Sequence, residues 1–294
     1  MSRACLFDTT RCIGCRACQV ACKQWNELSA ETTSLRPERA GFQNPLAVSA
    51  KTFAVVTFHE VADKKAPGEM RWLFTKRQCM HCLEPSCASA CPVTALHKTT
   101  EGPVAYDVSK CIGCRYCVGA CPFGAPTAEW DSLAPKIRKC TGCLERSLSP
   151  SIPEVINGQA ADKSSLNRYQ QAQTIPACVK ACPTGCLLFG ERDALLVEAH
   201  RRIKETPTRY VDHVYGEKEV GGTGALYLSS VPFAERGFRT DLGDRGYPKY
   251  SEAALKAVAP AVVGLGAVLG GVYWITQRRE QIKQEQSQEL RIKN

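Results

Sequence analysis

The sequence predicts a loop-rich α+β fold that is followed by one C-terminal transmembrane helix. Three observations support this prediction. The cysteines gather in four dense stretches, which are typical of loops that bind a cofactor rather than of long regular elements. Short segments between these stretches have the composition of strands or helices. An uncharged apolar run lies near the C-terminal end and is long enough to cross a bilayer.

Sixteen of the eighteen cysteines belong to the four stretches, which use one pattern repeatedly. The first stretch is Cys12-x2-Cys15-x2-Cys18-x3-Cys22, and the second is Cys79-x2-Cys82-x4-Cys87-x3-Cys91-Pro92. The third is Cys111-x2-Cys114-x2-Cys117-x3-Cys121-Pro122, and the fourth is Cys140-x2-Cys143 followed, after an insert, by Cys178-x3-Cys182-Pro183.

The pattern C-x2-C-x2-C-x3-C-P is the run by which bacterial ferredoxins hold [4Fe–4S] clusters. Three closely spaced thiolates bind one cluster, and the fourth cysteine binds the other cluster of a pair. We expect that fourth cysteine to begin a short helix, with proline in its first turn. Disulfide frameworks do not repeat this spacing, and zinc ribbons need only paired C-x2-C units. The sequence therefore predicts four [4Fe–4S] clusters with sixteen cysteine ligands to iron, in two ferredoxin-like di-cluster modules.

Two cysteines remain outside this ligand set, and one of the five histidines lies within a cysteine stretch. Cys5 lies in a strand-like segment, and Cys186 follows a Pro-Thr-Gly turn. We interpret both as buried small apolar residues rather than ligands. His81 lies inside the second stretch, where a ligand role is open, but a structural role is favoured because the loop already supplies cysteines.

Between the stretches, residues 51–60 and 71–76 are rich in Val, Phe and Thr and predict two paired strands. Residues 22–30 and 191–202 have helical composition, and short helices are expected after each fourth cysteine. The insert at 144–177 is rich in Ser, Gln, Asn and Pro and predicts an irregular surface loop. Residues 203–250 predict an extended connector. We expect no catalytic dyad or triad, so the chain is not an enzyme on its own.

Residues 257–276 contain no charged side chain, and at about 1.5 Å per residue they span about 30 Å. Tyr273 and Trp274 fit a membrane interface, and Gly266-x3-Gly270 offers a surface for close helix packing. The N-terminus has no apolar secretory signal. The distribution of basic residues on the two sides of the apolar run slightly favours a cytoplasmic tail and an exported cluster domain. The net charge is +9, and the charged residues are scattered along the chain. This distribution favours a solvated surface and no nucleic-acid partner.

Five strings of the sequence resemble the four-cluster iron–sulfur subunits of molybdopterin oxidoreductases. These strings are CIGCRACQVACKQWN, KRQCMHCLEPSCASACP, CIGCRYCVGACPFGAP, KCTGC and ACPTG. CQVAC before Trp-Asn, with the apolar C-terminal run, is most similar to the β subunit of membrane-bound formate dehydrogenases. The resemblance implies the following ligand sets: cluster one, Cys12, Cys15, Cys18 and Cys182; cluster two, Cys22, Cys140, Cys143 and Cys178; cluster three, Cys79, Cys82, Cys87 and Cys121; cluster four, Cys91, Cys111, Cys114 and Cys117.

The resemblance also implies the domain organisation. The first module would comprise residues 1–30 and 134–202, with the second module, 31–133, inserted in it. A connector at 203–256, the membrane helix at 257–276 and a polar tail at 277–294 would follow.

The implied function is electron conduction in the inner (cytoplasmic) membrane. A molybdopterin catalytic partner with molybdenum or tungsten would oxidise formate, and electrons would pass through the clusters to a membrane cytochrome b or quinone. The cluster domain would lie on the periplasmic side. The same subunit type could instead serve a membrane-bound [NiFe] hydrogenase or a reductase of polysulfide, thiosulfate or tetrathionate. A stand-alone polyferredoxin or a redox sensor is an alternative of another class.

Overall fold

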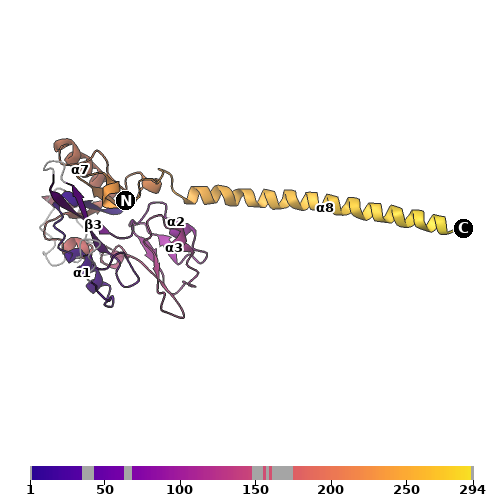
Figure 1. Cartoon of the computed structure of the whole chain (residues 1–294), viewed down its shortest axis with the longest axis horizontal. Helices are drawn as coiled ribbons and strands as arrows, with labels where there is room; N and C mark the ends of the chain where they lie inside the picture. Colours follow the sequence, from indigo (N-terminus) through magenta and orange to yellow (C-terminus); the bar gives the residue numbers. More distant parts are fainter. Residues whose placement is uncertain are drawn as a thin grey trace. The chain divides into compact units, whose positions relative to one another are not determined.

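The computed structural model describes residues 2–34, 43–62, 68–147, 155–156, 159–160 and 175–292. The chain divides into two compact units, Met1–Tyr247 and Pro248–Asn294. Figure 1 shows the first unit as a mixture of short strands, short helices and loops, and the second as a single long helix. The expected α+β, loop-rich character is therefore confirmed for the cysteine-bearing unit.

A three-stranded sheet forms the centre of the first unit, in the order β10-β1-β11. Strand β1 (Arg3–Asp8) pairs antiparallel with β10 (Leu187–Glu191) and parallel with β11 (Ala225–Leu228). Helix α7 (Arg192–Glu205) covers one face, because Leu195, Ala199 and Ile203 recur every four residues and pack on apolar strand residues. The helix expected at 191–202 is thus confirmed.

The other sheets that the described residues form are antiparallel and have two strands each. Strands β2 (Val55–Ala62) and β3 (Met70–Arg77) form the longest pair and confirm the strands expected at 51–60 and 71–76. The shorter pairs are β4 (Leu96–Lys98) with β5 (Val104–Tyr106), β6 (Thr127–Ala128) with β7 (Ile137–Arg138), and β8 (Val155–Ile156) with β9 (Gln159–Ala160). The last pair lies in the 144–177 insert, most of which falls outside the described residues.

Short helices lie within the cysteine stretches: α1 (Ala17–Trp25), α2 (Ser86–Ser89), α3 (Tyr116–Ala120) and α6 (Ala177–Lys180). Helix α4 (Leu144–Ser147) follows the fourth C-x2-C loop. The expectation that helices begin at each fourth cysteine was wrong. The helices precede Cys91, Cys121 and Cys182, and the prolines that follow these cysteines lie in turns.

The helix expected at 22–30 was also wrong in its bounds. Arg16, with a left-handed backbone at φ 61°, directly precedes α1, and Glu27 at φ 51° lies just beyond its end. A left-handed residue cannot continue a right-handed helix, so these two positions fix the helix between them.

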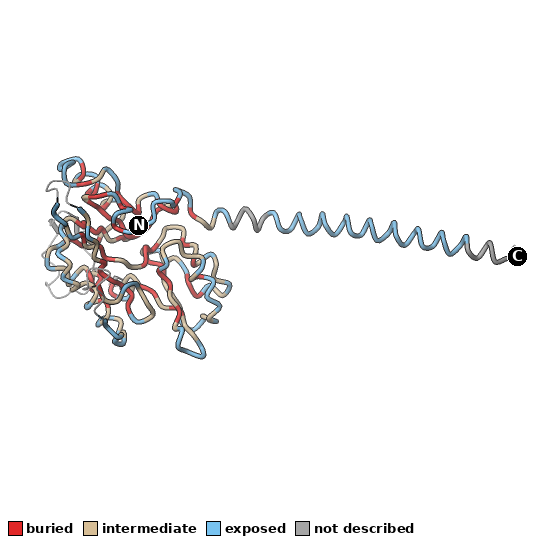
Figure 2. The backbone as a smooth tube through the Cα atoms, in the orientation of Figure 1, coloured by how far each residue is buried: buried red, intermediate tan, exposed pale blue. Residues whose placement is uncertain are grey.

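The segment from 203 onward is more than an extended connector. It supplies β11 and two short 3-10 helices, η2 (Glu219–Gly221) and η3 (Phe233–Arg236), while a third, η1 (Thr9–Arg11), follows β1. Tyr215, Tyr227 and Phe238 from this segment are buried together with Phe7 of β1. Figure 2 shows buried residues running through the first unit.

The second unit consists of helix α8 (Pro248–Ile292), which contains Pro260. Its portion Ala257–Gln286 is long and apolar enough to cross a membrane, and none of it is buried in the chain. The helix expected at 257–276 is confirmed as a helix. The tail expected at 277–294 continues the same helix as far as Ile292.

Candidate metal centres

The four C-x2-C loops share one backbone geometry. The residue before the second cysteine is left-handed in each: Gly14 at φ 69°, His81 at 48°, Gly113 at 74° and Gly142 at 68°. The N–H of this residue donates a hydrogen bond to the sulfur of the loop's first cysteine, with Gly142 N and Cys140 Sγ 3.4 Å apart. Such donors stabilise negative charge on sulfur, as a metal-bound thiolate requires.

The helices of the stretches pack in two pairs. Helix α1 of the first stretch contacts α6 of the fourth, and α2 of the second contacts α3 of the third. These contacts bring cysteines from distant parts of the sequence near one another. The assignment of each thiol to one of the four ligand sets stays a prediction.

The cluster-four cysteines line a common cavity, together with Tyr106 and Ile137. Burial raises the pKa of Cys117 to about 11, and the other three cluster-four thiolates add to the rise. The cluster-three cysteines are also close neighbours. Burial raises the pKa of Cys82 well above its ordinary value, and the other three thiolates of that set raise it further.

The cluster-two cysteines meet where α1 contacts α6. Burial raises the pKa of Cys22 well above its ordinary value, and the other three cluster-two thiolates raise it further, while the cation of Lys76 opposes the rise. Thiols that raise one another's pKa repel as anions, so a group of four needs a bound cation to hold them all as thiolates.

Three of the cluster-one cysteines lie in one loop. Burial raises the pKa of Cys18 to about 12, and Cys178, Cys12 and Cys15 add to the rise, while the cation of Lys76 opposes it. The fourth, Cys182, adjoins them through Cys186, whose sulfur lies 3.3 Å from that of Cys182. A hydrogen bond from Cys186 lowers the pKa of Cys12 to about 7.

The two remaining cysteines differ in their surroundings. Cys5 lies in β1, as expected, and is partly buried. Cys186 is 3% exposed, which confirms the expected burial, but the sequence interpretation missed its contact with a ligand candidate. A signal was present, because Cys182-Pro-Thr-Gly-Cys186 matches Cys91-Pro-Val-Thr-Ala95 and Cys121-Pro-Phe-Gly-Ala125 in position.

The donor set fits iron–sulfur clusters. All eighteen cysteines lie in described residues, and none forms a disulfide. Among the described residues, no three Cys, His, Asp or Glu side chains converge closely enough to hold a single metal ion. A cubane does not require that convergence, because each cysteine binds a different iron. Buried Lys76 and Lys139 add positive charge beside the thiolates, which suits anionic clusters.

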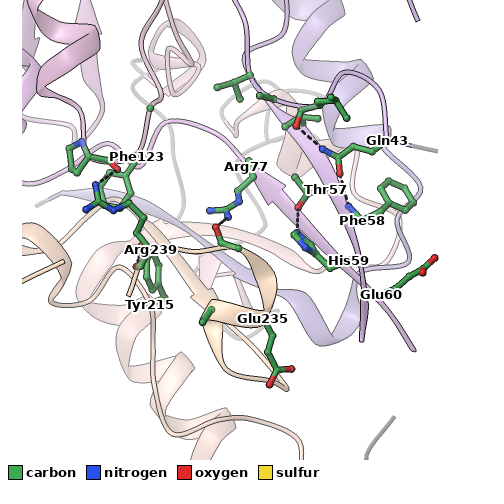
Figure 3. A pocket seen from close by; sticks show the side chains of 18 residues that line it. Gln43, Thr57, Phe58, His59, Glu60, Arg77, Phe123, Tyr215, Glu235 and Arg239 are labelled. Carbon is green, nitrogen blue, oxygen red and sulfur yellow. Dashed lines mark hydrogen bonds between the residues drawn. The ribbon is translucent and has the colours of Figure 1, made fainter. Parts of the chain in front are cut away.

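A separate surface pocket of about 730 Å³ lies between β2, β3 and the segment at 215–239. Figure 3 shows Arg77 and Arg239 extending into it, and His59 hydrogen-bonded to Thr57 at 3.1 Å. No cysteine lines this pocket, so it is distinct from the candidate metal centres.

Comparison with known proteins agrees with the cysteine geometry. Two family models, both described as 4Fe–4S dicluster domains, match residues 11–95 and 70–166. A protein of Nitratidesulfovibrio vulgaris is 41% identical over 286 residues, which are 97% of this chain and 69% of that protein. The hydrogenase-2 operon protein HybA of Escherichia coli O157:H7 is 31% identical over 250 residues, covering 78% of this chain and 70% of HybA.

The formate dehydrogenase-O iron–sulfur subunit of Escherichia coli K12 is 36% identical over 226 residues, covering 76% of this chain and 65% of that subunit. This chain belongs to the family of iron–sulfur subunits that includes this formate dehydrogenase subunit and HybA. It carries [4Fe–4S] dicluster domains. The alignment spans slightly less than two thirds of the formate dehydrogenase subunit's length.

Proposed function

We propose that this member of the family is the electron-transfer subunit of a membrane-bound oxidoreductase and carries four [4Fe–4S] clusters in the four ligand sets named above. The main support is the pairing of the cysteine stretches through the contacts of α1 with α6 and α2 with α3, together with the mutual effects on pKa among the thiols proposed for sets two, three and four. When bound, such clusters accept and release single electrons, at potentials that span roughly −700 to +450 mV.

The chain's own residues have three tasks in this proposal. The cysteine thiolates bind iron, and the loop N–H groups donate to their sulfurs. Apolar side chains exclude water, as Leu96, Val104 and Ile137 do around Cys87 and Cys117. Buried lysines supply positive charge, with Lys139 Nζ donating to the carbonyl of Cys140 at 2.9 Å.

We place the subunit beside a molybdopterin catalytic subunit that oxidises formate and a membrane cytochrome b subunit or quinone. The formate dehydrogenase relatives support this partner choice. Helix α8 would cross the inner membrane once within Ala257–Gln286, and the cluster-bearing unit would face the periplasm. Thiolate ligation by a partner protein is not needed, since the sixteen cysteines complete four sets of four.

A hydrogenase is the second candidate partner, because HybA is also a relative and the alignment covers 70% of its length. The same electron-transfer role would then begin with hydrogen instead of formate. The residues that bind clusters do not distinguish the two, because they act only after the substrate has been oxidised elsewhere.

An anaerobic pull-down of this subunit from native membranes in detergent tests the choice. Formate-dependent dye reduction by the captured complex, together with a large molybdopterin subunit, would support the formate assignment. Hydrogen-dependent reduction with a different large subunit would overturn formate and retain the electron-transfer role. A captured chain with about sixteen irons is expected in either case.

A further inference from the structure

His81 occupies a position that is glycine in the other three C-x2-C loops. The loops read CIGC, CMHC, CIGC and CTGC, and the third residue of each is left-handed. Glycine adopts this conformation at no steric cost, whereas a histidine at φ 48° is strained. Because Gly would satisfy the backbone, the imidazole itself must contribute something that offsets the strain.

The imidazole has a defined tautomer. Its Nδ1 accepts a hydrogen bond from the Val104 N–H at 3.1 Å, so the ring proton of a neutral histidine resides on Nε2.

The Nε2–H group is buried, and no hydrogen-bond acceptor for it exists in the part of the chain that the structure describes. The whole residue is only 6% exposed, so bulk water does not replace the missing acceptor. A buried donor without an acceptor costs about 1–3 kcal/mol. The structure thus presents an oriented donor whose acceptor is not part of the described protein.

The ring lies where two cysteine loops meet. It belongs to the Cys79–Cys82 loop, and its Cε1 would be 3.3 Å from a Cβ placed on Gly142 of the Cys140–Cys143 loop. The proposed function assigns these loops to clusters three and two. A sulfur atom of a bound cluster is an acceptor of the kind that this buried donor lacks within the described part of the protein.

We propose that His81 Nε2–H donates a hydrogen bond to a sulfur of one of the two [4Fe–4S] clusters whose loops, Cys79–Cys82 and Cys140–Cys143, meet at this ring, and thereby raises the reduction potential of that cluster. His81 is a positioning and tuning residue, not a ligand. The inference rests on the proposed clusters, since hydrogen bonds to sulfur stabilise the more negative reduced state.

Pulsed EPR of the reduced full-length protein, grown with ¹⁵N-histidine, tests this without a variant. A weak ¹⁵N coupling to one cluster is expected, and an exchangeable proton should accompany it. Complete iron loading with no histidine coupling to any cluster would overturn the inference and leave the proposed function intact. Absence of iron and of cluster EPR signals would instead refute the proposed function.

The variant His81→Asn adds a second readout. Asparagine tolerates the left-handed backbone and places an oxygen where Nδ1 accepts from Val104, but it lacks a donor at the Nε2 position. We expect loss of the ¹⁵N coupling and a lower reduction potential of one cluster. A tenfold change in the reduction equilibrium corresponds to ~59 mV for a one-electron couple. His81→Gln, which can reach the same acceptor, should shift the potential less.

His97→Asn is the matched control, because His97 is exposed on β4 of the same region. Its coupling pattern and midpoint potentials should equal those of the unaltered protein. If His81→Asn also leaves every midpoint potential unchanged while retaining its iron, the hydrogen bond to sulfur is refuted.

Discussion

At the scale of single residues, the ligand assignment separates two neighbouring cysteines. In the proposed assignment Cys182 binds cluster one, whereas Cys186 stands at a position that is Ala95 or Ala125 in equivalent turns. We expect Cys182→Ala to lose about four irons per chain, because one cubane loses a ligand. Cys186→Ala should keep its iron, since alanine already fits this turn twice. Iron and sulfide analysis of the purified proteins measures both, and equal iron loss in the two variants would contradict the assignment.

A buried cation should influence the two clusters nearest to it. Lys76 is 2% exposed, and the thiolates of Cys178, Cys18 and Cys140 raise its pKa well above the ordinary value although burial lowers it. Two unit charges about 8 Å apart at an effective dielectric constant of ~20 interact by about 2 kcal/mol. Lys76→Met nearly conserves the side-chain volume. It should therefore lower the equilibrium constant for one-electron reduction of clusters one and two by more than tenfold.

An EPR-monitored redox titration measures that effect. Lys51→Met removes an exposed lysine of the same charge and should leave all midpoint potentials unchanged. A uniform shift of all four clusters in Lys76→Met would contradict the local origin that the burial of this lysine implies.

The residues that carry the chemistry were predictable to different degrees. Cysteine spacing alone identified the sixteen ligand candidates, because thiolates must recur at short intervals around a cubane. His81 and Cys186 were visible only when equivalent positions of the four stretches were compared with each other. The unpaired Nε2 of His81 could not be predicted, because it depends on Val104 and Gly142, which lie 23 and 61 residues away in the sequence.

At the scale of elements, a buried ionic network joins α7 to the central sheet. Asp8 at the end of β1 is fully buried and accepts from Arg202 Nη1 and Tyr210 Oη, each at 2.9 Å. Asp8→Asn removes the charge that balances Arg202, and breaking such a buried pair costs about 3 kcal/mol. The thermal midpoint of the iron-loaded protein should fall by about 6–12 °C.

Circular dichroism during heating, at fixed iron content, measures the change. The exposed residue Asp131 provides a control, because Asp131→Asn alters the same functional group at the surface. An Asp8→Asn midpoint equal to that of the control would show that Arg202 is balanced by Glu198 alone, to which its Nε donates at 2.8 Å.

Local elements were predicted better than distant pairings. The β2–β3 pair was predicted from two adjacent β-rich segments, and α7 was predicted from the helical composition of residues 191–202. Strand β11 was missed because it has only four residues and pairs with β1 across about 220 positions, a contact that local composition does not report. Helix α1 was displaced in the prediction because its start depends on the left-handed backbone of Arg16.

At the scale of the whole molecule, the cysteine-bearing unit and the apolar helix have separable physical requirements. The unit Met1–Tyr247 contains all eighteen cysteines and its own buried core, whereas Ala257–Gln286 exposes its apolar side chains along the helix. The division of the first unit into modules 1–30 with 134–202 and 31–133 stays a prediction. Limited proteolysis of the loaded protein would test it.

Removal of residues 248–294 should therefore abolish membrane association without removing iron. Fully burying apolar side chains contributes about 1.5–3 kcal/mol each, so exposing Val263, Leu265 and Leu269 to water is unfavourable unless lipid or a partner helix covers them. We expect the full chain to partition into the detergent phase and the shortened chain into the aqueous phase, both with about sixteen irons. A matched variant with Glu280→Gln, just beyond the uncharged run, should partition like the full chain. Recovery of the full chain in the aqueous phase would contradict a membrane span and favour a helix that binds only to protein.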